Sequence, residues 1–273
     1  MAILTIDAGN TRVKWGLFDE SGNLLTQGVS LHAELAMLQL PMGEQVVISN
    51  VAGNAIELAL KKLLINHHKI TWLTAKAQIC GVTNSYEIPS QLGTDRWAAI
   101  IAAAYLHKQS SDLAPCIVVN AGTAVTIDVI TFSEKLNDLP VKANKLNVNL
   151  QAHFAGGIIL PGLNLMQQCL LQNTANLDHK SKLVANQSDN QAIANNTKDA
   201  IYLGAIHAIC GAIYNIANQY QNNQLSPDII LSGGDAIVIK NSLTGDMTKQ
   251  VHIVDNLVLQ GLYLQSVNLQ AFI

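Results

Sequence analysis

An acidic and a basic residue, Asp95 and Arg96, stand side by side before the apolar stretch WAAIIAAAYL. We expect this stretch to form a buried helix with residues 93–96 at its N-terminus. A charged pair at the mouth of a buried helix suits a reaction site. Asp95 would orient a substrate hydroxyl and accept its proton, while Arg96 would pair with a substrate carboxylate or a transferring phosphoryl group. The alternative is that Thr94 or Asp95 is only the N-cap of the helix, with Arg96 as its partner.

The position of Asp95 also predicts the strength of this acid. The positive end of a helix dipole favours a carboxylate, so we expect the pKa of Asp95 to be low and the residue to be a weak base. Phosphoryl transfer tolerates a weak base, because its loose transition state needs the hydroxyl positioned more than deprotonated. The pair is therefore compatible with a phosphotransferase.

Two glycine turns, in TIDAGNTRVKWGLFD and VVNAGTAVTIDVI, align so that Asp7 meets Asn120 and Gly9 meets Gly122. Each turn joins two apolar runs, and each glycine lets backbone N–H groups approach a ligand closely. Asp7 could hold Mg²⁺ through water. Two such turns facing each other could grip a nucleoside triphosphate from both sides. The alternative is that both are ordinary hairpin turns without a ligand.

Two further segments are rich in glycine, LSGGDA at 231–236 and GGIILPGL at 156–163. The first could let the backbone pass close to an adenosine, and the second could contact a ligand. A loop that needs a positive φ and a bend before a helix explain them equally well, so the sequence leaves both interpretations open.

The order of the expected elements repeats along the chain. Strands are expected at 2–9, 11–19, 24–30, 45–52 and 70–73, with helices at 33–40 and 54–68. The second half again starts with three strands, at 116–122, 123–130 and 151–160, followed by helices at 162–172 and 200–220, strands at 228–233 and 251–254, and a last helix at 257–269. The repeat predicts two α/β domains, 1–112 and 113–273. In such sheets ligands bind at strand ends and between domains.

Composition excludes several classes of protein. The 273 residues are 49% hydrophobic and 13% charged, with a net charge of -3 and no basic cluster. This argues against binding to nucleic acid or to a membrane surface. No apolar run is long enough for a transmembrane helix, and the N-terminus lacks the basic region of a signal peptide. The four cysteines form no CxxC pair and predict reduced thiols in a cytoplasmic protein.

Five segments occur in the order seen in type III pantothenate kinases, and the chain resembles that family from Asp7 to about Ala236. The segments are DAGNT, YEIPSQLGTDR, AGTAVTID, GGIILPG and NTKDAIYLGAI. The resemblance implies an α/β fold of duplicated ribonuclease-H-like domains, the superfold of acetate and sugar kinases, heat-shock 70 and actin. It also implies ATP-dependent phosphorylation of pantothenate to 4′-phosphopantothenate, the first step of coenzyme A synthesis. Such enzymes are typically homodimers that use Mg²⁺ and a monovalent cation, K⁺ or NH₄⁺.

The resemblance also implies roles for individual residues. The ATP-binding residues would be Asp7, Ala8, Gly9, Asn10, Thr11, Arg12, Val13 and Lys14 in the first turn, with Gly122 and Thr123 in the second. Pantothenate would be bound by Tyr86, Gly93, Thr94, Asp95, Arg96 and Thr197, with Asp95 as the proton acceptor. Thr197 could also be the N-cap of the helix that follows it, and both roles can hold together.

The chain departs from the family pattern at Asn120, where the family usually has an Asp that contributes to the monovalent-cation site. An amide oxygen still ligates K⁺, but it lacks a formal charge, so we expect a weaker or altered cation requirement. Residues 131–151 are expected to form an exposed loop that is longer than usual, and residues 178–196 a lid, a dimer contact or a mobile loop.

Two other functions are considered. A regulatory homologue of the Bvg accessory factor type would bind a partner instead of turning over a substrate, and a kinase or phosphatase of the same fold would act on another small acid or on polyphosphate. Asp7 and Asp95 favour an enzyme, because a binding module needs no proton acceptor.

Overall fold

The computed structural model describes residues 2–109, 113–134, 150–173, 193–221, 225–245 and 250–267. The chain forms two compact units. Unit 1 comprises Met1–Cys116, Asp128–Gly156 and Asn256–Ile273, and unit 2 comprises Ile117–Ile127 and Gly157–Asp255. The domain boundary between residues 112 and 113, which rests on the repeated order of elements, stays a prediction.

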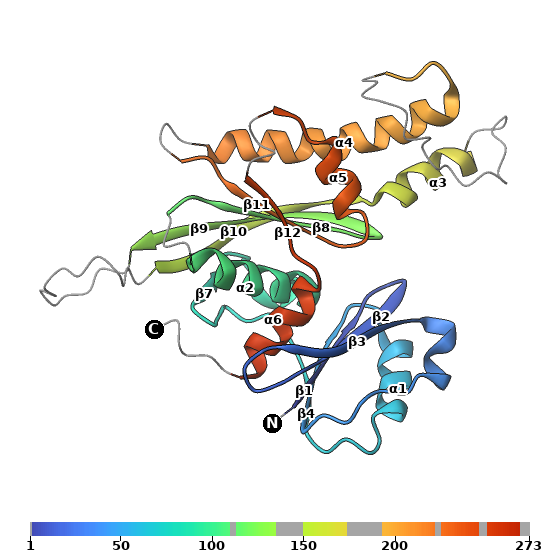
Figure 1. Cartoon of the computed structure of the whole chain (residues 1–273), viewed down its shortest axis with the longest axis vertical. Helices are drawn as coiled ribbons and strands as arrows, with labels where there is room; N and C mark the ends of the chain where they lie inside the picture. The colour runs from blue at the N-terminus through green and yellow to red at the C-terminus, as the bar shows by residue number, and fades with distance from the viewer. Residues whose placement is uncertain are drawn as a thin grey trace, which may run out of the picture. The chain divides into compact units, whose positions relative to one another are not determined.

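Unit 1 contains a five-stranded sheet in the order β3-β2-β1-β4-β5 (Figure 1). Its strands are β1 (Ile3–Ala8), β2 (Arg12–Phe18), β3 (Leu24–Leu31), β4 (Gln45–Asn50) and β5 (Ile70–Trp72). β1 pairs antiparallel with β2 and parallel with β4, so that Asp7 stands opposite Lys14 on one side and Ser49 on the other. The carboxyl ends of β1 and β4 therefore lie side by side.

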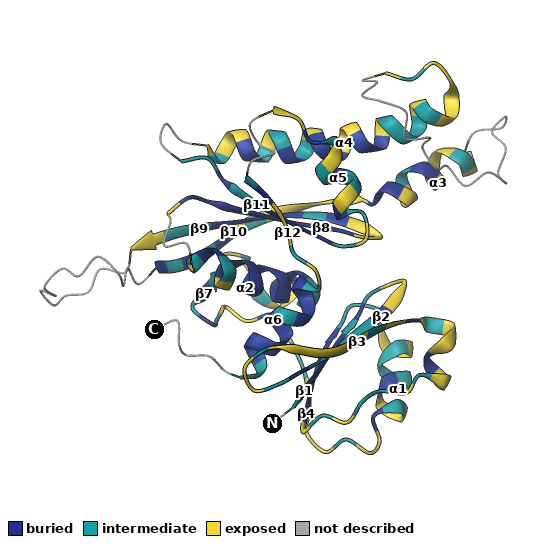
Figure 2. Ribbon diagram, in the orientation of Figure 1, coloured by how far each residue is buried: buried dark blue, intermediate teal, exposed yellow. Residues whose placement is uncertain are grey.

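Helices cover both faces of this sheet. The short helix η1 (His32–Met37) and α1 (Asn54–Leu63) close one face over a core of Leu4, Ile6, Ala8, Val13, Leu35, Val46, Ile48, Leu60 and Leu64. On the other face lie α2 (Thr94–Lys108) and α6 (Leu257–Ser266), which pack tightly on each other. Gly261 permits this approach, because a Cβ there would lie 1.8 Å from the carbonyl oxygen of Ala98. Figure 2 shows α2 buried along most of its length, as expected for its apolar sequence.

A second sheet has seven strands in the order β12-β11-β8-β9-β10-β7-β6. Its strands are β6 (Gln78–Ile79), β7 (Val82–Asn84), β8 (Cys116–Ala121), β9 (Ala124–Glu134), β10 (Leu150–Pro161), β11 (Asp228–Ser232) and β12 (Val251–Ile253). The division between the units runs through β9 and β10. The hairpin β6–β7, which pairs in parallel with β10 through β7, was not expected from the sequence, because its strands are too short to show a periodicity.

Unit 2 carries α3 (Leu163–Asn173), α4 (Thr197–Tyr220) and α5 (Ala236–Ser242). Within the described ranges, α4 alone has the length and apolar composition of a membrane-crossing helix. This is weak support for a membrane span, since the core helix of a soluble protein passes the same test. One side of α4 is buried in the unit, at Ala205, Ile206, Ile209, Cys210, Ile213 and Ala217.

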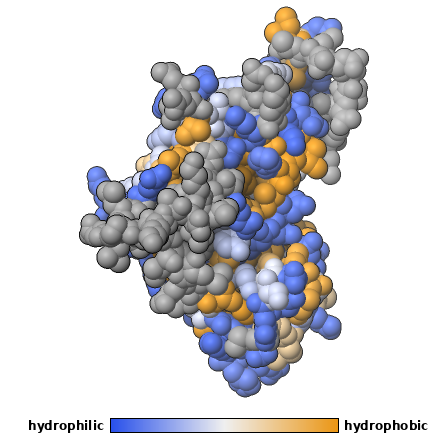
Figure 3. Space-filling model, turned by 60° about the vertical axis from the view of Figure 1, so that its left-hand side comes forward, coloured by the Kyte–Doolittle hydropathy of each residue, from blue (hydrophilic) through white to orange (hydrophobic). Residues whose placement is uncertain are grey.

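The predicted α/β class and the βββαβαβ order of the first half are confirmed, with η1 as the first, short helix. The expected loop at 131–151 is shortened at both ends, because β9 continues to Glu134 and β10 begins at Leu150. Residues 135–149 and 174–192, which include most of both expected loops, lie outside the described residues. On the face seen in Figure 3, apolar side chains form separate patches among hydrophilic ones.

Candidate functional site

Two half-buried carboxylates, Asp7 at the end of β1 and Asp95 at the start of α2, lie close enough for the charge of Asp95 to act on Asp7. Burial first, and then the charge of Asp95, raise the pKa of Asp7 to about 7, against a smaller lowering by Lys14. Asp7 Oδ1 is buried without a hydrogen-bond partner in the described parts of the chain. An unpartnered buried carboxylate oxygen is open to a proton or to a cation. The donor set fits Mg²⁺, which is usually held by one or two carboxylates, water and substrate phosphates.

The expectation that Asp95 has a low pKa is wrong. Burial raises the pKa of Asp95, and its effect exceeds the lowering by the backbone N–H and the charge of Arg96. The Asp95 carboxylate accepts a hydrogen bond of 2.8 Å from the Arg96 N–H. The loss of hydration therefore outweighs the helix N-terminus, and Asp95 is a stronger base than its sequence position predicts.

The start of α2 is shaped around the Asp95 carboxylate. Gly93, not Thr94 or Asp95, is the N-cap, so the interpretation of either residue as the cap is not borne out. A Cβ at Gly93 would lie 2.6 Å from Asp95 Oδ1, and glycine leaves room for that oxygen. The Thr94 hydroxyl lies 2.7 Å from Ser49 Oγ, which ties the first residue of α2 to β4. Ser49 was not identified from the sequence.

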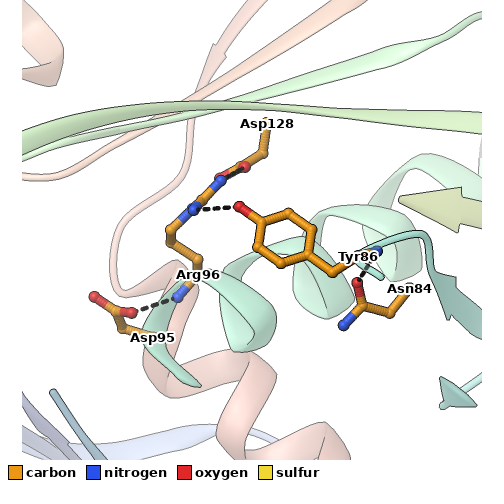
Figure 4. A network of polar contacts seen from close by, with 5 residues as sticks. All are labelled: Asn84, Tyr86, Asp95, Arg96 and Asp128. Atoms are coloured by element: carbon orange, nitrogen blue, oxygen red, sulfur yellow. Dashed lines mark hydrogen bonds and ion pairs between the residues drawn. The ribbon is translucent and has the colours of Figure 1, made fainter. Parts of the chain in front are cut away.

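Arg96 binds Asp128 rather than Asp95 (Figure 4). Its Nε donates to Asp128 Oδ2 at 3.3 Å and its Nη2 to Asp128 Oδ1 at 2.5 Å. The side chains of Arg96 and Asp128 are only 7% and 2% exposed. Burial lowers the pKa of Arg96, but the bonds and charges of Asp128 and Tyr86 exceed this effect and leave it raised. Sequence analysis missed Asp128, although a lone acid in the apolar strand AVTIDVI is a usable signal.

Tyr86 completes this network. Arg96 Nη1 donates to the Tyr86 hydroxyl at 3.0 Å, and the Arg96 guanidinium lies 5.9 Å from the centre of the Tyr86 ring. The Tyr86 N–H donates to Asn84 Oδ1 at 3.0 Å, and its ring packs at 5.6 Å from the ring of Phe154. The segment between β7 and α2, with its single turn of 3₁₀ helix η2 (Pro89–Gln91), is thus fixed at Tyr86 from three directions.

The first glycine turn lies in unit 1 and is open to solvent at Asn10, Thr11 and Arg12. The Gly9 N–H donates to the Arg12 carbonyl at 3.2 Å, which closes the turn. His32 Nε2 lies 2.9 Å from the Gly9 carbonyl oxygen, a support that sequence analysis did not find. Ala8 and Val13 are buried beneath the turn, while Lys14 is half-buried.

The second glycine turn lies in unit 2, and both other glycine-rich segments converge on it. The Gly162 N–H donates to the Thr123 carbonyl at 2.9 Å, and the Asp235 N–H donates to the Ala121 carbonyl at 3.2 Å. A Cβ at Gly162 would lie 2.1 Å from Gly122 O, and one at Gly233 would lie 2.2 Å from Ala121 O. These segments are therefore built to approach the turn backbone, which leaves Gly122 and Thr123 exposed.

Asn120 is half-buried at the end of β8, next to this turn. Thr197 also belongs to unit 2, where it is the exposed first residue of α4. The N-cap of α4 is Asn196, whose side chain accepts from the Asp199 N–H at 3.0 Å, so the interpretation of Thr197 as the cap is wrong. Thr197 lines an apolar pocket of about 780 Å³, to which α3 contributes Met166.

The structure thus brings together, within unit 1, Asp7, Tyr86 and residues 93–96, along with Ser49 and Asp128. A joint site of this set with Gly122, Thr123, Asn120 and Thr197 of unit 2 stays a prediction. In the described residues there is no group of three or more His, Cys, Asp or Glu side chains that could hold a metal ion.

Comparison of solved structures supports the fold. A Baf family transcriptional activator from Campylobacter jejuni is 20% identical, with a TM-score of 0.54 and 95% of each chain covered. Component A of the (R)-2-hydroxyglutaryl-CoA dehydratase of Acidaminococcus fermentans is 13% identical, with a TM-score of 0.50 over 99% of this chain and 100% of the other. A protein from Listeria monocytogenes described as a putative N-acetylmannosamine kinase is 14% identical, with a TM-score of 0.50 over 98% of this chain and 100% of the other. The predicted superfold of sugar kinases, heat-shock 70 and actin is confirmed.

Sequence comparison identifies the family. A family model described as type III pantothenate kinase matches residues 3–137 and 146–219. The type III pantothenate kinase of Nitrosospira multiformis is 38% identical over 267 residues, which is 95% of this chain and 89% of that protein. The type III pantothenate kinase of Methylobacillus flagellatus is 38% identical over 269 residues, or 96% of each chain. With its fold and its buried Asp95–Arg96 segment, this chain belongs to the type III pantothenate kinase family.

Proposed function

We propose that this protein transfers the terminal phosphoryl group of ATP to the hydroxyl of pantothenate and forms 4′-phosphopantothenate, the first step of coenzyme A synthesis. One observation carries the proposal: Asp95 is a half-buried carboxylate with a raised pKa at the start of α2, and its charge acts on Asp7, whose Oδ1 is buried and unpartnered in the described residues. The relatives named as type III pantothenate kinases supply the substrate.

In this proposal Asp95 accepts the proton of the pantothenate hydroxyl. The raised pKa improves it as a base, and the hydrogen bond from the Arg96 N–H holds its carboxylate in one orientation. Asp7 would hold Mg²⁺ through water, and a bound Mg²⁺ would neutralise charge on the triphosphate. The same cation would keep Asp7 ionised at neutral pH, because a neighbouring positive charge favours the carboxylate.

ATP would be bound by the backbone of the two glycine turns, residues 7–14 in unit 1 and Gly122 with Thr123 in unit 2. Both turns are exposed at their tips and carry small residues, so N–H groups can reach phosphate oxygens there. Asn120, beside the second turn, would supply an amide oxygen to K⁺ or NH₄⁺. The grip of both turns on one triphosphate is part of the proposal.

Pantothenate would be held by Tyr86, Thr197 and residues 93–96. Of the five N–H donors of a guanidinium, Arg96 uses three on Asp128 and Tyr86, which leaves two for the pantothenate carboxylate. Because Asp128 offsets the charge of Arg96, recognition would depend on directed hydrogen bonds more than on net attraction. We also propose that the protein is located in the cytoplasm and forms a homodimer. Analytical ultracentrifugation tests the oligomeric state.

The test is ADP formation by the purified protein with ATP and Mg²⁺, with and without pantothenate, in K⁺, NH₄⁺ or neither. We expect ADP only with pantothenate and more of it with the monovalent cation. The absence of pantothenate-dependent ADP under all cation conditions would contradict the proposal. A partner-binding regulator is not favoured. The likeness to the Campylobacter protein is one of fold alone, and a binding module has no need of two neighbouring carboxyl groups with raised pKa values, Asp7 and Asp95.

A further inference from the structure

We propose that Asp128 is a positioning residue for pantothenate, acting through Arg96 and, beyond it, Tyr86. Asp128 would not touch the substrate. Its role is to fix the plane and direction of the Arg96 guanidinium, so that the free donors and the Tyr86 hydroxyl are presented together (Figure 4). The inference rests on the proposed function, since it concerns the same substrate.

The contact between Asp128 and Arg96 fixes an orientation, not just a distance. Two bonds, from Nε and from Nη2, reach the two oxygens of one carboxylate, and such a side-on pair defines the plane of the guanidinium. Asp128 lies in the interior of β9, a strand of 11 residues that runs from Ala124 to Glu134, and its side chain is 2% exposed. A strand holds such a group more firmly than a loop does.

The orientation is passed on to Tyr86. Nη1 is the guanidinium nitrogen that takes no part in the pair with Asp128, and it donates to the Tyr86 hydroxyl at 3.0 Å. The other contacts of Tyr86, to Asn84 and to the ring of Phe154, fix its backbone and its ring but not its hydroxyl. The direction of that hydroxyl therefore depends on Arg96, and through it on Asp128.

Stability alone is a poor reason for this ion pair. Burying two charges costs nearly as much as their attraction returns, and apolar residues of similar volume often serve as well. The pair with Asp128 also keeps the Arg96 guanidinium away from the Asp95 carboxylate. Arg96 follows Asp95 directly, and its charge already lowers the Asp95 pKa. Without Asp128, the guanidinium would be free to pair with the Asp95 carboxylate and to weaken it as a base.

The test compares Asp128→Asn, Arg96→Gln and the double variant in the pantothenate-dependent ADP assay. For Asp128→Asn we expect kcat/KM for pantothenate to fall about 100-fold, the loss that a misplaced contact can cause. The KM for ATP should change little. In the Arg96→Gln background the same substitution should have almost no further effect, because its target is gone. Asp128→Glu should restore part of the lost kcat/KM.

Gln265→Met is the matched control. Gln265 is buried at 7% exposure, and among the described residues its side chain bonds only to Gly261 O of its own helix. Its loss therefore tests the effect of removing a buried polar side chain elsewhere in unit 1. It should leave the KM for pantothenate unchanged. The double variant also guards against misfolding, since it removes both buried charges together.

Equal losses from Asp128→Asn in the wild-type and Arg96→Gln backgrounds would overturn the inference, as would a parallel rise in the KM for ATP. An active wild type with an unaffected Asp128→Asn variant would overturn it while leaving the proposed function intact. A wild type without pantothenate-dependent ADP would overturn both.

Discussion

The two glycine turns share a backbone design and differ in what surrounds them. In the first, the Gly9 N–H donates to Arg12 O at 3.2 Å, and in the second the Gly122 N–H donates to Ala124 O at 3.0 Å. The first turn has a half-buried acid, Asp7, at its start and a side-chain support, His32. The second has a neutral Asn120 at its start and is flanked by other backbone segments.

The two turns therefore differ in the physical property that distinguishes each of them. The first turn is distinguished by charge, because burial and the charge of Asp95 raise the pKa of Asp7. The second is distinguished by close backbone approach, which Gly162 and Gly233 permit. We therefore expect substitutions of charge to act at the first turn and substitutions of volume to act at the second.

The largest effect is expected from Asp95→Asn. An amide of the same shape cannot accept the substrate proton, so kcat should fall by about 10²–10⁴-fold, the usual contribution of a general base. The KM for pantothenate should change little. Steady-state kinetics and a thermal unfolding curve check this. An unchanged kcat in a folded variant would remove Asp95 from the role given to it.

Volume should matter more at the second turn. In Gly233→Ala the new Cβ would overlap Ala121 O, and the residue has a φ of +100°, so we expect a loss of about 1–3 kcal/mol of unfolding free energy and a higher KM for ATP.

Gly234→Ala is the matched control, since no atom of the described residues lies within 4 Å of a Cβ there. Gly9→Ala tests the first turn, where the nearest described atom is Arg12 O at 3.6 Å. Urea denaturation measures all three. Equal losses of stability at Gly9 and Gly233 would contradict the contrast between the turns.

Charge at the first turn should appear in the pH dependence of stability. Burial and the charge of Asp95 raise the pKa of Asp7 to about 7 in the folded protein, from an ordinary value of 3.8, so the folded state binds more protons than the unfolded state between these values. The contribution of Asp7 to stability is present at low pH and is lost as the pH rises towards 7. Asp7→Asn should therefore gain a few degrees in Tm over the wild type between pH 5 and pH 8. A constant difference in Tm across this range would show that Asp7 does not titrate there.

The smallest effect is expected at Asn120. Asn120→Asp adds a formal charge at a half-buried position, so the K⁺ or NH₄⁺ concentration for half-maximal rate should fall by a few-fold. A cation titration at saturating ATP and pantothenate measures it, with Na⁺ for comparison. If the wild type already saturates at low millimolar cation and the variant gains nothing, Asn120 does not contribute to a cation site.

Turns and helix starts could be predicted from the sequence, whereas contacts between residues far apart in the chain could not. The glycine turns, the helix start at Thr94 and the strands β1 to β5 depend on neighbouring residues, and the structure has them as expected. The β6–β7 hairpin was not expected. The partner of Arg96 is 32 residues away on another element, so only the folded chain identifies Asp128. The prediction of a low pKa for Asp95 was wrong for a similar reason, because the burial that raises this pKa is a property of the tertiary structure.

The glycine-rich segments at 156–163 and 231–236 show the same limit. Their glycines indicated that the backbone of each segment lies close to another group, but the sequence did not identify that group. The atoms that they approach, at Ala121, Gly122 and Thr123, lie far away in the sequence. Spacing along one chain cannot identify such a contact, whereas it does identify the turn itself.

The most direct test of the account follows the phosphorus atom itself. ³¹P NMR of the wild-type protein with ATP, Mg²⁺, K⁺ and pantothenate distinguishes transfer to an alcohol from transfer to water. The account predicts a new phosphomonoester signal that grows in step with ADP and is absent without pantothenate. Growth of inorganic phosphate alone, or no consumption of ATP, would contradict it.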